Sequence, residues 1–99
     1  MIIMVQHHVR DYDAWKKVFD EHRSVREKHG ATGHLIYRGA EDRNAVTILN
    51  HFPSRERAES FAADPSLKEA MESAGVDGVP TITFLEEAEG LDYTTRMAM

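Results

Sequence analysis

The fold is decided by residues 2–15, IIMVQHHVRDYDAW, where a run of apolar residues gives way to a helix start. Residues 2–9 predict a strand, because β-branched and apolar residues favour an extended, pleated backbone. Asp11 is a candidate N-cap, since its side-chain oxygen can accept a hydrogen bond from the first turn. A helix is predicted over residues 12–29, and Gly30 ends it. The inward-facing stripe of this helix is Tyr12, Trp15, Val18, Phe19 and Val25.

The remaining elements follow from alternating apolar residues in strands and from caps and breaks in helices. They are strands over residues 32–38, 45–52 and 81–85, a turn at residues 77–80, and a helix over residues 54–74 that Asp64-Pro65 interrupts. Strands and helices thus alternate around a hairpin, which is the split βαβ, or ferredoxin-like, arrangement. We expect an α+β fold with a four-stranded antiparallel sheet and both helices on one face, because such crossovers are right-handed.

Composition excludes several classes of function. The 99 residues predict one domain over residues 1–89 and a C-terminal tail over residues 90–99. The 12 basic and 17 acidic residues give a net charge of −5, without the basic stripe that nucleic-acid binding requires. The absence of cysteine excludes a disulfide scaffold, an iron–sulfur site and thiol catalysis. With neither a signal peptide nor a run of about 20 apolar residues, we expect a cytoplasmic protein without a nucleic-acid or membrane partner.

The strands carry apolar residues on both faces. Ile3 and Val5 point one way, and Ile2 and Met4 point the other. Helices cover only one face, and a bare apolar sheet face of this size is unusual for a monomer. A chain of this length also has a thin core. We therefore expect a homodimer in which two copies pack sheet on sheet.

Three stretches carry a resemblance to a known family: VQHHVRDYDAW at residues 5–15, VFD at residues 18–20 and GVDGVPTITFLEE at residues 75–87. They resemble the dimeric α/β-barrel superfamily, which contains antibiotic-biosynthesis-type monooxygenases and some polyketide cyclases. The resemblance covers about residues 3–87, and it implies protomers that pair into a dimeric α/β barrel. Two positions depart from the family pattern: Val79 stands where a proline usually precedes Pro80, and Thr81 stands where a glutamate is common.

His7 is the first candidate for a catalytic role. It stands between Val5 and Val9 on one strand face, and a polar ring among apolar neighbours must be hydrogen-bonded or it costs free energy. One interpretation is a general base or ligand anchor in a pocket between sheet and helix. The other is a core histidine satisfied by Asp11, Tyr12 or the backbone.

Asn50 and His51 are further catalytic candidates, because they are polar at the end of a strand that could have stayed apolar. Asn50 can hold a carbonyl or enolate oxygen, a contact that cofactor-free oxygenases need, while simple strand-end solvation is the alternative. Trp15 and Phe19 form either an aromatic pocket wall or ordinary core. Tyr37 either donates its hydroxyl to a ligand or fills a strand face.

The six histidines show no metal-ligand spacing, so we expect no metal and no cofactor. His34 and His51 are expected to approach each other at the open end of the hairpin. The first hypothesis for function is a cofactor-independent monooxygenase- or cyclase-like enzyme acting on a small aromatic or polyketide-like molecule, as the resemblance implies. The alternative is a non-catalytic dimeric module that binds a small hydrophobic ligand. Haem binding comes last, because residues 54–74 contain no histidine to serve as an axial ligand.

Overall fold

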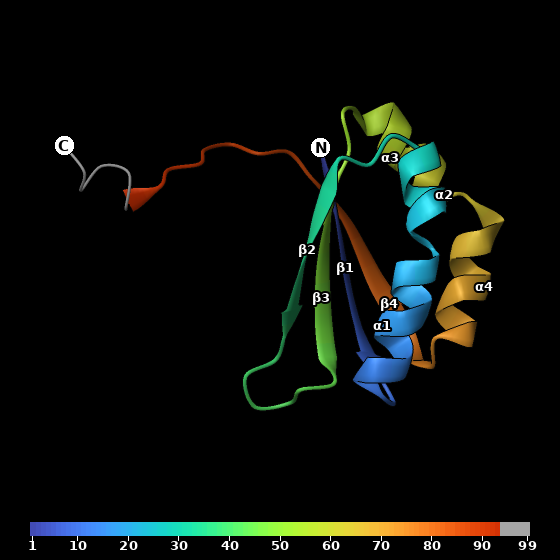
Figure 1. The fold of residues 1–99 in the computed structure, drawn as a ribbon. Coiled ribbons are helices and arrows are strands. Elements are labelled where there is room, and N and C mark those ends of the chain that lie inside the picture. The colour runs from blue at the N-terminus through green and yellow to red at the C-terminus, as the bar shows by residue number, and fades with distance from the viewer. Residues whose placement is uncertain (94–99) are drawn as a thin grey trace.

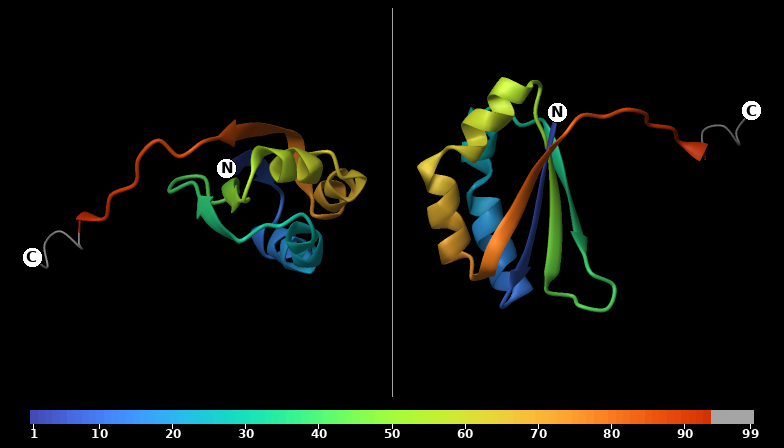
Figure 2. Two further views of the ribbon diagram at one scale, coloured as in Figure 1. Left: turned by 90° about the horizontal axis from the view of Figure 1, so that it is seen from above. Right: turned by 180° about the vertical axis from the view of Figure 1, so that it is seen from behind.

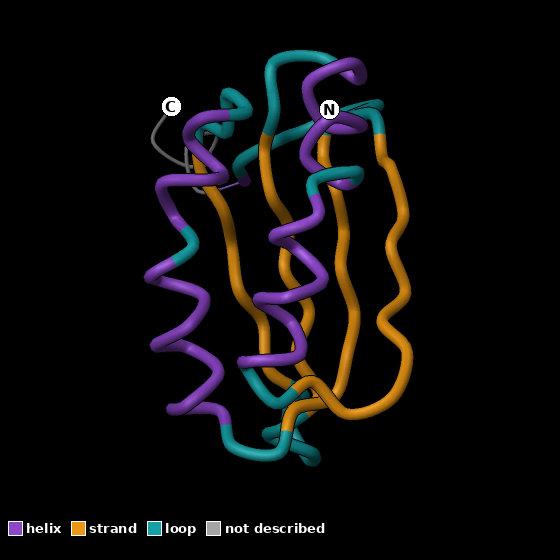
Figure 3. Tube along the Cα trace, turned by 90° about the vertical axis from the view of Figure 1, so that its right-hand side faces the viewer, coloured by secondary structure: helices purple, strands orange, loops and turns teal. Residues whose placement is uncertain are grey.

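The sheet of the computed structural model has four antiparallel strands in the order β2-β3-β1-β4 (Figure 1). The structure describes residues 1–93, and within them the helices all lie on one face of the sheet (Figures 1 and 3). The ferredoxin-like α+β prediction is therefore confirmed. The strands are β1 (Ile2–Val9), β2 (Gly33–Arg38), β3 (Ala45–His51) and β4 (Val76–Leu85). The helices are α1 (Tyr12–Glu21), α2 (Arg23–Lys28), α3 (Arg55–Ala62) and α4 (Pro65–Ser73).

The helix start predicted at Asp11 is confirmed, but the helix it begins is divided in two. The Asp11 carboxylate accepts hydrogen bonds from the backbone N–H groups of Asp13 and Ala14, at 3.0 and 3.3 Å. The single helix predicted over residues 12–29 is interrupted at His22, whose N–H is shared between the Val18 and Phe19 carbonyls. No glycine or proline marks this break. It lies opposite the second break in the helical layer, where the His22 ring contacts Ser66.

Strand β4 is longer than the sequence predicts. The predicted turn at residues 77–80 is wrong, because these residues continue the strand as an irregularity. His8 pairs with Asp77 and Gln6 pairs with Thr81, so three residues of β4 lie opposite His7. Gly78 supplies the φ of +81° that the irregularity uses. An edge strand tolerates the missing N–H donor of the proline at position 80, and β4 is an edge strand.

The core lies between the sheet and the helices. Side chains of β1 and β3 alternate as the sequence predicts, with Val46 and Ile48 buried on the inner face and Leu49 on the outer face. Trp15 of α1 and Phe61 of α3 close the core from the helical side. Within residues 1–93, no helix covers the outer face, and its β2 side chains Leu35 and Tyr37 are 49% and 54% exposed.

The residues that flank α2, His22 before it and His29 after it, tie the helical layer to the start of α4. His29 Nε2 lies 2.8 Å from Asp64 Oδ2, and the two side chains are only 17% and 16% exposed. His22 Nε2 lies 3.0 Å from Ser66 Oγ. Asp64 also caps α4 by accepting a hydrogen bond from the Ser66 N–H. The hydrogen bond from His29, followed by those from Ser66, holds the pKa of the Asp64 carboxyl well below its usual range.

The chain leaves the sheet after Leu85. Residues 86–93 run out on the side of the sheet opposite the helices (Figures 1 and 2). The tail predicted over residues 90–99 lies partly outside the described residues. None of the helices within residues 1–93 is long and apolar enough to cross a membrane. The cytoplasmic location stays a prediction.

Replacing Asp64 separates its two roles. Asp64→Asn keeps a good N-cap and loses the carboxylate that accepts the hydrogen bond from His29, whereas Asp64→Ala loses both. We expect Asp64→Ala to lower the free energy of unfolding by about 1 kcal/mol more than Asp64→Asn, measured by chemical denaturation at neutral pH.

The pH dependence of the same variants checks the hydrogen bonds that the ionised Asp64 carboxyl accepts. Because the pKa of Asp64 is lowered in the folded state, its contribution is present above the unfolded value of 3.8 and is lost as the pH falls below it. The stability gap between wild type and Asp64→Asn should therefore narrow below about pH 4. An unchanged gap in acid would contradict this role.

Candidate functional site

A small cavity lies between the helical layer and the inner face of the sheet. Its volume is about 50 Å³, and its wall is mostly apolar. The sheet contributes Val5, His7, Ile48 and Asn50; α1 and α2 contribute Trp15, Val18, Phe19 and Arg26, with His22 between them; Phe61, Leu67, Ala70, Met71 and Ala74 close the far side. The cavity is much smaller than the roughly 300 Å³ of a typical ligand pocket, and it has room for a few water molecules.

His7 projects from β1 into this cavity. The edge of its ring packs against Trp15, with ring centroids 5.7 Å apart. Both ring nitrogens are buried, and neither has a hydrogen-bond partner, so the expected contacts with Asp11, Tyr12 or the backbone are not made. Burial lowers the pKa of His7 to about 4, which keeps the ring neutral at pH 7. His7 is thus a neutral imidazole with free hydrogen-bonding capacity.

Asn50 lines the other end of the same cavity. Its side chain is buried, and its Oδ1 has no hydrogen-bond partner. Asn50 pairs with Ile3 across the strands, whereas His7 pairs with Val46. The positions of Ile3 and His7 differ by four residues of strand, about 13 Å along the sheet. One small group cannot contact both polar side chains, but an elongated molecule can.

Trp15 and Phe19 form one wall between these two ends. Their rings stack at 5.0 Å with 25° between the planes. His34 packs its edge against Phe19 at 4.9 Å. Stacked rings turn their faces toward each other, so Trp15 and Phe19 line the cavity with apolar ring edges.

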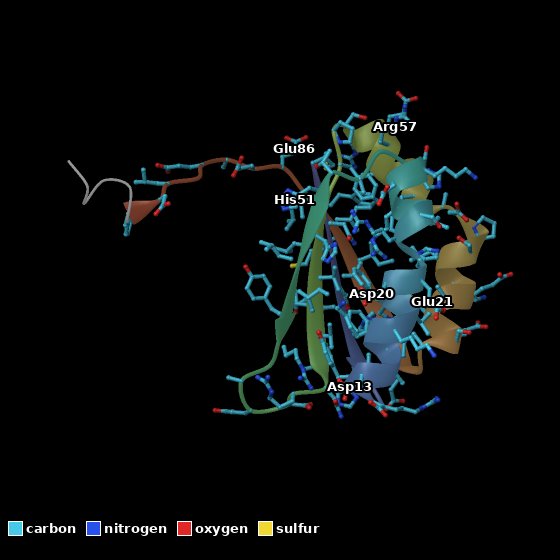
Figure 4. All side chains as sticks on the ribbon, viewed as in Figure 1. Asp13, Asp20, Glu21, His51, Arg57 and Glu86 are labelled. Carbon is cyan, nitrogen blue, oxygen red and sulfur yellow. The ribbon has the colours of Figure 1, made fainter. Side chains whose placement is uncertain are left out.

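His51 and Tyr37 do not join this cavity. Successive strand residues point to opposite faces, so Asn50 faces the helices and His51 faces away from them (Figure 4). Tyr37 pairs with Thr47 on that same outer face. His34 and His51 are likewise on opposite faces, so the predicted approach of their side chains is wrong. The predicted roles of His51 and Tyr37 stay predictions, now for the outer face.

Arg26 is the wall residue that the sequence analysis missed. It is 4% exposed, and its guanidinium carbon lies 3.7 Å from the centroid of the Phe19 ring. Its Nη1 donates a hydrogen bond to the Phe19 carbonyl at 2.8 Å. A signal for it exists in the sequence, because Arg26 follows Phe19 by seven residues and so continues the inward stripe of the helix. Within residues 1–93, no group of three or more metal-ligating side chains comes together.

Solved structures with the same fold include a cofactor-independent oxygenase and candidate antibiotic biosynthesis monooxygenases. SnoaB, a cofactor-independent oxygenase from Streptomyces nogalater, matches with a TM-score of 0.68 and 11% identity over 88% of this chain and 93% of its own. A candidate antibiotic biosynthesis monooxygenase from Bordetella bronchiseptica matches with a TM-score of 0.73 and 11% identity, over 89% and 96%. A similar candidate from Caulobacter crescentus matches with a TM-score of 0.70 and 16% identity, over 89% of each chain.

These similarities define the fold of the chain as that of the antibiotic-biosynthesis monooxygenase proteins, as the sequence resemblance predicts. No protein-family model and no curated protein sequence matches the chain.

The buried position of His7 makes a prediction for stability. Because its pKa falls from 6.5 to about 4 on folding, the unfolded chain binds more protons between these values. Stability is therefore full above pH 6.5 and is lost as the pH falls toward 4. His7→Gln should remove about 2 kcal/mol of this acid destabilisation, allowing for solvent screening of a partly exposed ring. Denaturation curves at several pH values measure it.

The matched control is His51→Gln, which removes an imidazole from the outer face of the same sheet. It should retain the acid sensitivity of the wild type. If His7→Gln kept the acid sensitivity of the wild type, the ring nitrogens of His7 would not be buried away from solvent.

Proposed function

We propose that this protein binds a small, planar, largely apolar molecule along the wall of Trp15 and Phe19 and acts on it without a cofactor, as an oxygenase or cyclase. The observation that carries this proposal is the pair of buried polar side chains, His7 and Asn50, that face an apolar cavity without hydrogen-bond partners. Such atoms cost free energy in the folded protein, so they are retained where a ligand uses them.

The two polar ends have different chemistry. The unpartnered Oδ1 of Asn50 can accept a hydrogen bond from a hydroxyl of the bound molecule. The Nδ2 of the same amide can donate one to a carbonyl oxygen that becomes an enolate, which stabilises a carbanion able to react with oxygen. His7 is a weak base, because its pKa is about 4. Taking a proton from a neutral phenol, whose pKa is about 10, is uphill by several kcal/mol. Negative charge on the bound molecule offsets this difference by favouring the protonated imidazole.

The ligand must widen the cavity. Leu67 and Met71 line the cavity on one side and an outer groove of about 530 Å³ between α4 and β4 on the other. Both side chains are only partly buried, and methionine changes rotamer readily. A rotation of these two side chains would join the cavity to the groove, which gives the ligand an entrance and the necessary volume.

A second candidate function is ligand binding without chemistry. The small volume of the cavity and the low basicity of His7 favour this alternative. It uses the same residues and needs no proton transfer.

Oxygen uptake distinguishes the two functions. Wild-type protein is incubated with a panel of polycyclic phenols and aryl ketones, and oxygen consumption is compared with binding measured by native mass spectrometry. We expect His7→Ala to abolish turnover and Asn50→Ala to slow it by about 100-fold, the usual effect of losing one oxyanion donor. His8→Ala, which alters the neighbouring residue on the outer face, is the control and should leave turnover unchanged. Binding without oxygen uptake or product would support the non-catalytic function.

We also propose that two copies pair through the outer face of the sheet. Leu35 and Tyr37 are half exposed there, and Leu49 lies on the same face of the neighbouring strand. Residues 86–93 run out on this side, where a second copy would lie (Figure 2). Sheet-on-sheet packing would bury these apolar side chains and supply what the thin core of one protomer lacks.

Light scattering at micromolar concentration tests the pairing. The wild type should have twice the 11.3 kDa mass of one chain. Leu49→Arg should give monomers, because it places an unpaired charge in the buried interface. Glu56→Arg on the exposed side of α3 is the control and should remain dimeric. A wild-type monomer would overturn the proposal.

A further inference from the structure

Arg26 is a buried cation that has no carboxylate within ion-pair distance in the described part of the chain; the charges of Asp20 and Glu27 act on it only from farther away. It is 4% exposed, and none of the ion pairs within residues 1–93 includes it. By contrast, the exposed arginines Arg23 and Arg55 each pair with a glutamate one helical turn away. Burying a charge is costly unless the charge is paired, so the burial of Arg26 lowers the free energy of unfolding.

The contacts of Arg26 offset only part of this cost. The Phe19 carbonyl accepts one hydrogen bond from Nη1, and the Phe19 ring lies against the guanidinium. A guanidinium carries five N–H donors in a fixed plane, and the remaining donors are available to an acceptor outside the chain. Their geometry suits a carboxylate, which can accept two parallel hydrogen bonds.

Arg26 stands between two spaces. On one side it lines the apolar cavity, and on the other it lines an open pocket of about 440 Å³. The wall of the outer pocket is completed by Arg23, Glu27, Ala31, Thr32, Gly33 and His34. Arg26 is the residue that the two linings share.

The outer pocket also lies close to Asn50. His34 and Asn50 are directly paired across β2 and β3 and point to the same face. Their side chains therefore start about 5 Å apart. A group bound beside Arg26 and His34 lies at the Asn50 end of the cavity and away from His7.

The charges around this pocket favour an anion. Two permanent cations, Arg23 and Arg26, face it, and its one carboxylate, on Glu27, is already paired with Arg23. Burial and then the positive charge of Arg26 lower the pKa of His34, which favours the neutral ring, so His34 offers a hydrogen bond and no charge. This local excess of basic groups contrasts with the net charge of −5 of the whole chain.

We propose that Arg26 binds the carboxylate of the ligand, so that the substrate class is an aromatic carboxylic acid. The carboxylate enters from the outer pocket and pairs with the guanidinium, while the ring system extends along the cavity, past the edges of Phe19 and Trp15, toward His7. This inference rests on the proposed function only for where the ring system lies. Arg26 acts here as a specificity-determining residue.

Calorimetric titration with 2-naphthoate and its neutral amide, 2-naphthamide, tests the assignment. The wild type should bind the acid about tenfold or more tightly than the amide, because the amide lacks the negative charge and the second acceptor oxygen that the guanidinium can use. Arg26→Met keeps a similar shape without the charge and should erase this preference. Arg26→Lys keeps the charge without the planar fork and should restore part of it. Arg57→Met, an exposed arginine on α3, is the matched control and should behave as the wild type.

Stability of the ligand-free variants adds a readout that needs no ligand. If Arg26 is held for ligand binding, Arg26→Met should be as stable as the wild type or more stable, because an unpaired buried charge is removed. A strong loss of stability would mark Arg26 as structural. Equal affinity of the wild type for acid and amide, or no binding of either at millimolar concentration, would also overturn the assignment.

The outcome is separable from that of the proposed reaction. A carboxylate preference that depends on Arg26, with no oxygen uptake from any substrate, would leave the binding site standing and remove the enzymatic function. Turnover that depends on His7 and Asn50, with acid and amide used equally, would leave the enzymatic function standing and remove the carboxylate-binding site.

Discussion

The pairing of β1 with a neighbour on each side is the constraint on which the rest of the structure depends. β1 lies between β3 and β4, so its inward side chains, Val5, His7 and Val9, are held against the helices. A shift of one residue would turn all of them to the outer face. The register therefore decides that His7 meets Trp15 in the cavity, and that His8 lies outside beside Asp42.

The helical layer is likewise held in place by contacts between segments that are distant in the sequence. The residues on either side of α2 contact the start of α4, through His29–Asp64 and His22–Ser66. These contacts hold α2 against the start of α4. Arg26 belongs to α2, so its position between the cavity and the outer pocket depends on this join. The contacts of His22 and His29 thus fix the helix that carries the unpaired charge of Arg26.

Much of the fold could be predicted from local signals. The Asp11 cap, the strand over residues 2–9 and the break at Asp64-Pro65 all depend on near neighbours in the chain, and all are present. The break at His22 and the strand residues 77–80 were not predicted correctly. Both depend on contacts with distant segments, the first with Ser66 and the second with β1, which override the local preference.

The candidate site divides in the same way. Periodicity alone placed His7, Trp15 and Phe19 on inward faces, because side-chain direction follows from the strand and helix repeats. The same repeat separates Asn50 from His51, yet only the register with β1 shows which of the two meets the cavity.

The sequence by itself therefore determined the order of elements, the inward stripes and the absence of thiol chemistry, since these follow from residue type and spacing. Only the tertiary structure decided that the nitrogens of His7 and the oxygen of Asn50 are unpartnered and that Arg26 is buried without a carboxylate. Burial and hydrogen bonding depend on the whole set of neighbours that folding brings together, and no local stretch of sequence contains that set.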